Sequence, residues 1–373
     1  MNWNFYMPVK IYFGNGKIQE LESIINDLGC ANGVLICDPV FAGNGLAQKV
    51  IECSNGKLVE VFSDISQNPT IENADNCAAV LRNRKAEFAV ALGGGSSIDC
   101  AKAACAIAKE GDSIRNYHTG GKNLSIENAI PLIAVPTTAG TGSEVTSVTV
   151  LTDNQKKLKA PLGNPVLYPK AAVIDPELTL SVPKGVTAST GLDVLSHALE
   201  GFWSIHHQPI CDALALSAAR LAFTYLTVVF ENTNDLNGRR AMCEASLLAG
   251  IAFSHPKTSG PHACSFPLTN IYKMPHGEAC AFTLDVFTKL NAEAENGRLH
   301  EFAKDCGFVD AYEMADRISE LKKLFGLRTT LADIGVPGPF IQDLAVRSMH
   351  PNMLNNPVRM DAEAVEKLYR TIG

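Results

Sequence analysis

The sequence predicts an α/β N-terminal domain with a parallel sheet, followed by an all-α C-terminal domain. Up to about residue 183, short apolar runs bounded by Gly, Pro or Asp alternate with helical patterns. That alternation is typical of a parallel sheet covered by helices on both faces. From Val186 onward the strand patterns stop and helical patterns follow one another. We therefore expect two domains, at residues 1–183 and 184–373.

Four apolar runs are the expected strands: residues 33–38 (GVLICD), 88–95 (FAVALGGG), 130–136 (IPLIAVP) and 171–176 (AAVIDP). Each has the length of a buried strand and is bounded by turn residues. The stretch NADNCAAVLRNR, between the first two runs, has a helical pattern. In the second half, the helices are expected to break at NTNDLNG, HPKTSGP, KMPHG, LNAEAENG and GVPGP.

The composition restricts the classes of partner. The chain has 373 residues, of which 46% are apolar, enough for a substantial core. Its 32 basic and 39 acidic residues give a net charge of −7, so there is no electrostatic reason to expect nucleic acid or an anionic membrane. The longest apolar runs fall short of the roughly 20 residues of a spanning helix, and the N-terminus has no signal-peptide pattern. The 11 cysteines are scattered without a CxxC pair, and their odd number in a large chain indicates reduced thiols in a cytoplasmic protein.

Two loops are candidates for binding phosphate. Gly93, Gly94 and Gly95 follow an apolar run and precede a helical pattern. Such a turn lets backbone N–H groups approach an anion, and the positive end of the helix dipole favours phosphate there. Ser96 can cap this helix and donate to the phosphate. A second loop, PTTAGTGSE at 136–144, also follows a strand, where open α/β sheets bind ligands. Together the two loops favour a nucleotide crevice over two ordinary capped turns.

Asp38 ends the first predicted strand. A carboxylate there can accept hydrogen bonds from ribose hydroxyls and repel a 2′-phosphate, which favours NAD over NADP. The alternative is an aspartate that only opens the turn DPVFAGNG. The glycine spacing departs from GxGxxG, so the common dinucleotide fingerprint is absent.

A metal site is indicated in the helical half. Asp193 and His197 lie four residues apart in GLDVLSHALEGF, so a helix places them on one face, about 6 Å apart at Cβ. His262 and His276 each follow a proline and precede an apolar helical stretch. One carboxylate and three imidazoles suit a divalent first-row metal such as Fe²⁺ or Zn²⁺, and they exclude a calcium site. Spacing alone does not join the two halves, since each histidine is also typical of a core or capping residue. The competing histidines are His118, His206, His207, His255, His300 and His350.

Taken together, ALGGGSSIDCAK, PTTAGTGSE, GLDVLSHALE, PHACSFPLTN, MPHGEACA and NNPVRMDAEAVEKLY resemble the iron-containing (group III) alcohol dehydrogenase family. The resemblance runs from about residue 8 to 370, with the motifs in the family's order. It implies a dehydroquinate synthase-like fold, NAD(H) and Fe²⁺ or Zn²⁺ as cofactors, a small aldehyde or alcohol substrate, and a homodimer or larger assembly. It assigns the metal to Asp193, His197, His262 and His276. It assigns cofactor contacts to Asp38, Asn68, Gly93, Gly94, Gly95, Ser96, Asp99, Thr137, Thr138, Thr141 and Lys159.

One position departs from the family's pattern. Many members carry a second histidine four residues after the one matching His262, and here that position is Phe266. A phenyl ring cannot carry protons, so water, ribose hydroxyls, His255 or another polar group would have to. The SFPLT and MPHG variant resembles members that reduce anionic two-carbon aldehydes, such as sulfoacetaldehyde or phosphonoacetaldehyde. In that case Lys257 and Arg359 are candidates for binding the acid group.

Three other functions fit the same residues. A general short-chain alcohol dehydrogenase, or a 1,2- or 1,3-propanediol dehydrogenase, would use the same cofactor and metal. A non-redox, metal-dependent cyclase or lyase of the dehydroquinate synthase type shares the fold and a GGGS-like turn. A non-catalytic nucleotide or metal sensor would bind NAD without turnover.

Overall fold

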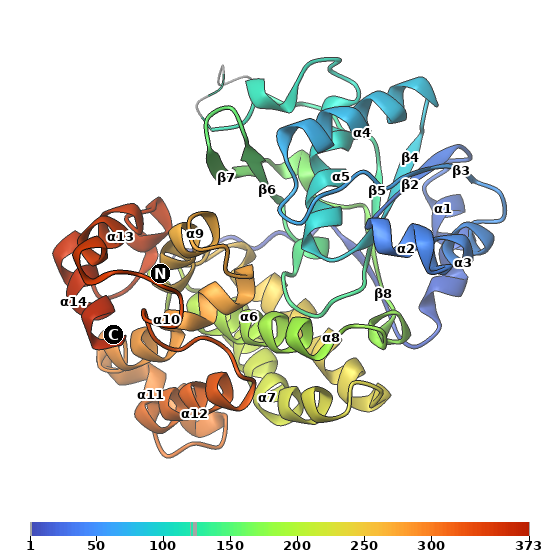
Figure 1. Cartoon of the computed structure of the whole chain (residues 1–373). Helices are drawn as coiled ribbons and strands as arrows, with labels where there is room; N and C mark the ends of the chain where they lie inside the picture. Colours follow the sequence, from blue (N-terminus) through green and yellow to red (C-terminus); the bar gives the residue numbers. More distant parts are fainter. Residues whose placement is uncertain (1, 120, 122–124, 373) are drawn as a thin grey trace. The chain divides into compact units, whose positions relative to one another are not determined.

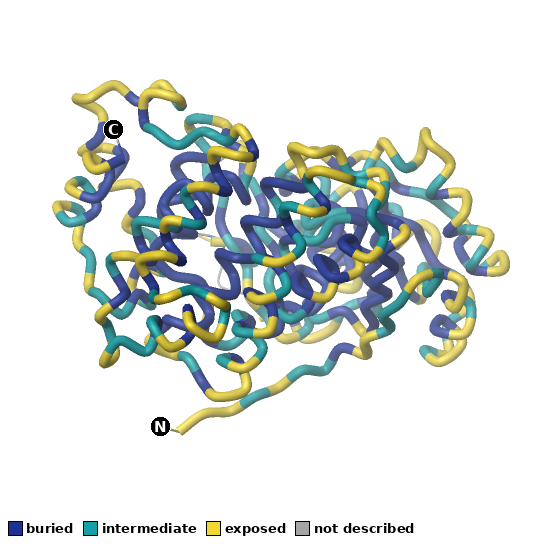
Figure 2. Tube along the Cα trace, turned by 90° about the horizontal axis from the view of Figure 1, so that it is seen from below, coloured by how far each residue is buried: buried dark blue, intermediate teal, exposed yellow. Residues whose placement is uncertain are grey.

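The structure, a computed structural model, describes residues 2–119, 121 and 125–372, and its contacts divide the chain into two compact units (Figure 1). The α/β unit contains Tyr6–Thr138 and Gly142–Leu180. The helical unit contains the chain from Ser181 onward, together with Met1–Phe5 and Ala139–Thr141. Figure 2 shows buried chain in the interior and exposed chain at the periphery.

The two units differ from the expected division after residue 183: the boundary falls after Leu180, and two short segments, at 1–5 and 139–141, belong to the helical unit. Gly140 donates its backbone N–H to Ser246 Oγ (2.7 Å), and Asn4 accepts a hydrogen bond from Gln208 Nε2 (3.4 Å). Both partners lie in helices or loops of the helical unit. These are contacts between residues far apart in the sequence, so a composition change along the chain does not reveal them.

A six-stranded sheet forms the centre of the α/β unit, and every paired neighbour is parallel. Its order is β1 (Lys10–Phe13), β8 (Ala171–Ile174), β5 (Leu132–Pro136), β4 (Phe88–Gly93), β2 (Gly33–Cys37) and β3 (Leu58–Phe62). The four predicted strands are β2, β4, β5 and β8. The two edge strands were not predicted, because their half-exposed residues form no continuous apolar run.

Helices cover both faces of this sheet, which confirms the predicted fold class. Along β2, Val34 and Ile36 belong to one apolar core, while Leu35 and Cys37 belong to the other, as the alternation of side chains along a strand requires. The first core includes α4 (Ile71–Asn83) and α5 (Gly95–Ile107). The second includes η1 (Lys17–Glu20), α1 (Leu21–Asp27) and α3 (Leu46–Cys53).

The remaining elements of the α/β unit are short. An antiparallel hairpin, which the apolar runs did not predict, pairs β6 with β7. The hairpin strands are β6 (Val148–Asp153) and β7 (Leu158–Gly163). The unit also contains a short helix, α2 (Pro39–Gly43), and four 3₁₀ turns: η2 (Ile114–Asn116), η3 (Ser143–Val145), η4 (Pro165–Leu167) and η5 (Pro176–Thr179).

The helical unit is built around α6 (Lys184–Trp203), which is buried along nearly its whole length. Its apolar core joins α6 to the helices that follow it, and the breaks fall in the polar and Pro- or Gly-rich stretches predicted. Those helices are α7 (Pro209–Glu231), α8 (Leu236–Ser254), α9 (Gly260–Asn270), α10 (His276–Leu290), α11 (Arg298–Asp305), α12 (Ala311–Leu324), α13 (Ile341–Arg347) and α14 (Ala362–Ile372), with η6 (Ala294–Gly297), η7 (Gly338–Phe340) and η8 (Pro351–Asn355) between them.

Helix α7 is long and apolar enough to cross a membrane by length and composition alone. It packs against α6 and α8, and Ala215, Ala218, Ala222 and Leu226 are completely buried in the shared core. Core helices pass the same test of length and composition, so α7 carries no argument for a membrane span.

Candidate active site

The predicted phosphate-binding residues lie together at the carboxyl end of the sheet. β2 lies between β3 and β4 in the sheet, so the direction of chain progression reverses between β2 and β4. Open α/β sheets bind ligands at such a reversal. Asp38 follows β2, Gly93 ends β4, and α5 begins at Gly95.

The glycine turn is tight. A Cβ atom at Gly93 would lie 2.3 Å from Ser97 Oγ, and Gly93 has φ +154°, a conformation that other residues rarely adopt. A Cβ atom at Gly94 would lie 3.1 Å from Thr138 Oγ1. The Thr137 N–H donates to the Gly93 carbonyl (3.0 Å), so the two predicted loops are in contact.

Asn68, Ser96 and Lys159 are also brought to this turn. The Asn68 N–H donates to Ser96 Oγ (3.3 Å), and Lys159 Nζ donates to Asn68 Oδ1 (2.7 Å). Asn68 has φ +60°, which aspartate, asparagine and glycine tolerate best. Asp38 caps α2 by accepting a hydrogen bond from the Val40 N–H (3.0 Å), as the turn interpretation expected.

Two of the expected cofactor contacts, Asp99 and Thr141, have surroundings that differ from those of the residues at the glycine turn. Asp99 accepts hydrogen bonds from Ser143 Oγ (2.6 Å) and the Val150 N–H (2.9 Å), so its carboxylate holds the second loop and β6. Lys102 supports the same region through Ser143, because its Nζ donates to Ser143 Oγ (3.0 Å). Thr141 belongs to the segment that packs with the helical unit.

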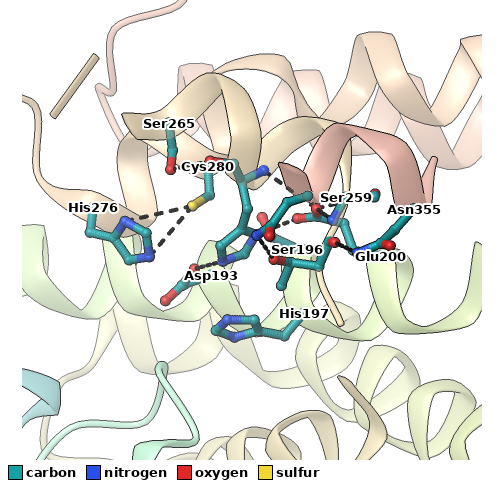
Figure 3. Close-up of polar contacts among 12 residues, drawn as sticks. Asp193, Ser196, His197, Glu200, Ser259, Ser265, His276, Cys280 and Asn355 are labelled. Carbon is teal, nitrogen blue, oxygen red and sulfur yellow. Dashed lines mark hydrogen bonds and ion pairs between the residues drawn. The ribbon is translucent and has the colours of Figure 1, made fainter. Parts of the chain in front are cut away.

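Four potential metal ligands converge in the helical unit (Figure 3). One ligand atom from each of Asp193, His262, His276 and Cys280 lies within 4.8 Å of the other three. Asp193 and His262 are almost fully buried, and Cys280 is completely buried. Asp193 Oδ1 and His262 Nε2 are 3.7 Å apart, and His262 Nε2 has no hydrogen-bond partner within the described residues. A buried imidazole nitrogen in this state fits a metal ligand.

The start of α10 lies directly against α6, which brings His276 to Asp193. A Cβ atom at Gly277 would lie 2.1 Å from the Ser189 carbonyl oxygen and 3.0 Å from Asp193 Cβ. The Glu278 N–H donates to Ser189 Oγ (3.0 Å). Glycine after His276 is therefore needed for the close approach of the two helices.

His197 is adjacent to this group without being one of its four members. Its ring stacks on Phe253, with centroids 4.1 Å apart, and lies 4.7 Å from the ring of His262. Nδ1 is 3.2 Å from the Gly140 carbonyl oxygen. A carbonyl can only accept, so Nδ1 carries the proton and Nε2 keeps a lone pair suited to a metal.

Glu200 is completely buried and holds His262 in place. Its carboxylate accepts a hydrogen bond from His262 Nδ1, and it also accepts from the backbone N–H groups of Ser259 (2.5 Å) and His262 (3.3 Å). A carboxylate that accepts from the distal nitrogen of a metal-binding histidine fixes the ring's tautomer and orientation. This arrangement presents His262 Nε2 to the proposed ion.

Comparisons with known proteins identify the family. A family model described as iron-containing alcohol dehydrogenase matches residues 8–176, and the model of the family's C-terminal part matches residues 187–373. The chain belongs to the iron-containing alcohol dehydrogenase family. It is accordingly an NAD(H)-linked oxidoreductase that uses iron. This family assignment confirms the resemblance found in the sequence and disfavours the non-redox cyclase and the sensor.

Individual relatives cover nearly the whole dehydrogenase. Alcohol dehydrogenase 4 of Saccharomyces cerevisiae is 33% identical over 369 residues, which is 97% of this chain and 96% of the relative. Sulfoacetaldehyde reductase from Bifidobacterium kashiwanohense, solved in complex with NAD⁺, is 46% identical, with a TM-score of 0.97 and coverage of 100% and 99% of the two chains. A 1,3-propanediol oxidoreductase structure is 29% identical, with a TM-score of 0.94 over 100% of both chains.

Cys280 and Glu200 were missed in the sequence, although helical spacing pointed to both. Glu200 is seven residues after Asp193, and Cys280 is four residues after His276. Spacings of four and seven place residues on one helical face. An acidic residue or a cysteine in a helix is common, so this spacing gains meaning only once the partner helices are known.

Burial and neighbouring groups set the protonation of the site. Burial and the neighbouring His262 hold the pKa of His197 well below its usual value. For His262, burial by itself lowers the pKa, but Cys280 and Glu200 outweigh it and raise the pKa well above its usual value. Burial raises the pKa of the Cys280 thiol to about 11. A metal ligand must be deprotonated, so an ion bound here would release protons.

Phe266 lies beside an imidazole from another part of the chain. The rings of Phe266 and His350 are tilted by 36°, with centroids 4.3 Å apart. His255 is engaged elsewhere, because its Nδ1 is 2.9 Å from Ser254 Oγ and its ring stacks on Phe5.

Replacing Glu200 with glutamine is expected to weaken metal binding by about 10-fold to 100-fold, the usual effect of losing a carboxylate behind a ligating histidine. The amide is neutral, and its –NH₂ group cannot accept from the N–H groups that now share the carboxylate. Metal affinity is measured by competition with a chromophoric chelator. Glu301→Gln, an exposed change on α11, is the control, and equal affinities in the two variants would contradict the assigned role.

Proposed function

We propose that this dehydrogenase interconverts a short anionic aldehyde and its alcohol, with sulfoacetaldehyde as the first candidate substrate. The observation that carries the proposal is the 46% identity over the full chain to a sulfoacetaldehyde reductase. It agrees with the sequence motifs around Phe266 and His276. Phosphonoacetaldehyde has the same two-carbon aldehyde and a different acid group, so it is the second candidate.

The metal ligands in this proposal are Asp193, His197, His262 and His276. The donor set fits: Asp193, His197 and His262 are buried and His276 is partly buried, the set combines imidazole nitrogens with a carboxylate, and such ligands suit Fe²⁺ or Zn²⁺. A bound ion would supply Lewis acidity toward the aldehyde carbonyl group. Glu200 holds the His262 ring, and the Gly140 carbonyl holds the His197 ring, so both imidazoles are oriented before any ligand binds.

The cofactor site in this proposal is the glycine turn and its neighbours. NAD(H) supplies or accepts the hydride. Its pyrophosphate would be bound at the start of α5 by the backbone N–H groups of Gly94, Gly95 and Ser96. Asp38 would accept hydrogen bonds from the ribose hydroxyls and disfavour a 2′-phosphate. We therefore expect a preference for NADH over NADPH.

An anionic substrate requires a cation, and Lys257 and Arg359 are the proposed pair. Both are exposed, and within the described residues neither forms an ion pair with a carboxylate. Lys257 lies just after α8 with φ +67°, and its Nζ donates to the Ser254 carbonyl (2.6 Å). A cation bonded only to a neutral carbonyl keeps its charge available for a sulfonate or phosphonate.

The two cations lie on segments that are bonded to each other. Asn352 Nδ2 donates to Thr258 Oγ1 (2.7 Å), and Asn355 Nδ2 donates to the Thr258 carbonyl (2.8 Å). Thr258 follows Lys257, and Asn355 is four residues before Arg359. The next residue, Ser259, donates to Glu200 behind His262, so this segment continues directly into the proposed metal site.

The first test is an initial-rate screen after anaerobic Fe²⁺ loading. The aldehydes are sulfoacetaldehyde, phosphonoacetaldehyde, acetaldehyde, propanal and 3-hydroxypropanal, each with NADH and with NADPH. The proposal expects the highest kcat/KM for an anionic aldehyde with NADH. A higher kcat/KM for propanal or 3-hydroxypropanal would instead favour the alcohol and propanediol branch, to which the 1,3-propanediol oxidoreductase neighbour belongs by name.

Removing either cation is expected to raise KM for the anionic aldehyde by roughly 10-fold to 100-fold, since a hydrogen bond to a charged group contributes about 1.5–3 kcal/mol. For Lys257→Ala and Arg359→Ala, KM is measured with the anionic aldehyde and with acetaldehyde as the neutral substrate. KM for acetaldehyde should change little. Lys273→Ala is a matched control, because Lys273 also has positive φ (+55°) and donates to a carbonyl three residues earlier (2.7 Å). Equal changes for both aldehydes would remove that residue from the anion site.

Two broader properties complete the proposal. We expect a homodimer or a larger homo-oligomer, which sedimentation velocity measures directly. We also expect a cytoplasmic location, which suits the reduced state of all 11 cysteines in the structure.

A further inference from the structure

We infer that Cys280 is a thiolate ligand of the metal in the substrate-free enzyme, in addition to nitrogen and carboxylate ligands. The inference rests on the metal site proposed above. Cys280 Sγ lies 3.8 Å from Nε2 and 3.9 Å from Nδ1 of His276. It also lies within 4.8 Å of the ligand atoms of Asp193 and His262. Figure 3 shows the sulfur directed at the His276 ring.

The direction of the Cys280 side chain follows from α10. His276 is the first residue of this helix, and Cys280 is one turn later on the same face. The first turn of α10 is anchored, because Gly277 lies against α6 and the Glu278 N–H is bonded to Ser189. Cys280 is therefore fixed beside Asp193 by the same packing that positions His276.

A second observation shows that this group of residues is arranged for a ligand. His262 Nε2 is buried and has no hydrogen-bond partner among the described residues, although Glu200 fully engages the other nitrogen of the ring. Burying such a nitrogen without a partner costs free energy. An ion among the four side chains would bond to that nitrogen and to the sulfur together.

Ligation changes the chemistry of the site in a defined way. The Cys280 S–H bond is broken, a sulfur–metal bond forms, and the proton is released to solvent. No electrons are transferred. Thiolate is a softer ligand than imidazole or carboxylate, so it favours zinc over magnesium, calcium or manganese. Of the 11 cysteines, Cys280 is the one that belongs to the four-residue ligand group.

X-ray absorption at the zinc edge tests the inference on the full-length protein loaded with one equivalent of Zn²⁺. A thiolate ligand gives a Zn–S distance of about 2.3 Å, distinct from nitrogen and oxygen ligands at about 2.0–2.2 Å. We expect one sulfur in the wild type and none in Cys280→Ser. Cys211→Ser is the matched control: Cys211 is completely buried, like Cys280, but lies in α7 outside the ligand group. It should keep the sulfur signal.

The outcomes distinguish a failure of the Cys280 inference from a failure of the proposed metal site. A wild-type shell of nitrogen and oxygen only, at full metal occupancy, overturns the role of Cys280 and leaves the metal site intact. A sulfur signal that persists in Cys280→Ser also overturns it. Failure to bind stoichiometric metal at all overturns both. Since wild-type spectra decide the first outcome, the test does not depend on the variant folding. Cobalt substitution gives a second readout, a near-ultraviolet sulfur-to-cobalt absorption lost only in Cys280→Ser.

Discussion

Replacing Asp193 with alanine is expected to abolish stoichiometric metal binding and to lower kcat/KM for the aldehyde by about 10³-fold or more. Asp193 is the carboxylate of the proposed ligand set, and it is 1% exposed. Lewis-acid stabilisation of developing negative charge contributes several kcal/mol, and each 1.36 kcal/mol is a factor of about ten in rate. Without this carboxylate, the three imidazoles and the inferred Cys280 thiolate would have to hold the ion with one negative charge fewer to neutralise it.

Metal content is measured by mass spectrometry and activity by NADH consumption. NADH affinity should stay within a few-fold of the wild type, because the proposed cofactor residues other than Thr141 lie in the α/β unit, which has its own cores. Asp316→Ala, an exposed change on α12, is the control for removing a carboxylate. An Asp193→Ala enzyme with full metal content and near wild-type kcat/KM would show that the ion is held elsewhere.

The His197→Ala variant tests whether His197 is a metal ligand. The family resemblance includes His197, whereas the four atoms that converge in the structure include Cys280 in its place. If His197 is a ligand, its loss should lower metal affinity about as much as the loss of His262. If the affinity changes by less than threefold, the stacking of His197 on Phe253 is its main role.

Replacing Gly93 with alanine is expected to weaken NADH binding by roughly 10-fold to 100-fold. The new methyl group would lie 2.3 Å from Ser97 Oγ and 2.6 Å from Ser97 Cβ, so the start of α5 would have to move. The backbone at φ +154° adds strain, since such conformations cost about 1–3 kcal/mol for residues other than glycine. Both effects displace the N–H groups that are proposed to bind pyrophosphate.

NADH affinity is measured by quenching of protein fluorescence. Gly163→Ala is the control, because a Cβ atom there would only meet Val148 Cγ2 at 3.9 Å, an ordinary contact. The double variant Gly93→Ala/Ser97→Gly removes the clash but keeps the strain, so it should recover part of the lost affinity. Unchanged affinity in Gly93→Ala would exclude this turn from the cofactor site.

Local patterns were sufficient for most of the fold. β2 and β4 are continuous apolar runs that end in turn residues, so their strand character depends only on neighbouring residues. The hairpin of β6 and β7 was missed, because many of its residues are half-exposed and its strands are defined by pairing with each other. The docking of Gly140 on Ser246 was missed for a similar reason.

The sequence by itself determined which residues share a face and which loops follow strands. Helical periodicity placed Asp193 and His197 together, and a strand followed by glycines placed Ser96 at a helix start. Family resemblance, not spacing, joined His262 and His276 to them. Only the tertiary structure decided that Glu200 orients His262 and that Cys280 faces Asp193. The physical reason is that these contacts join separate helices, and their approach depends on packing such as Gly277 against Ser189, which no local pattern encodes.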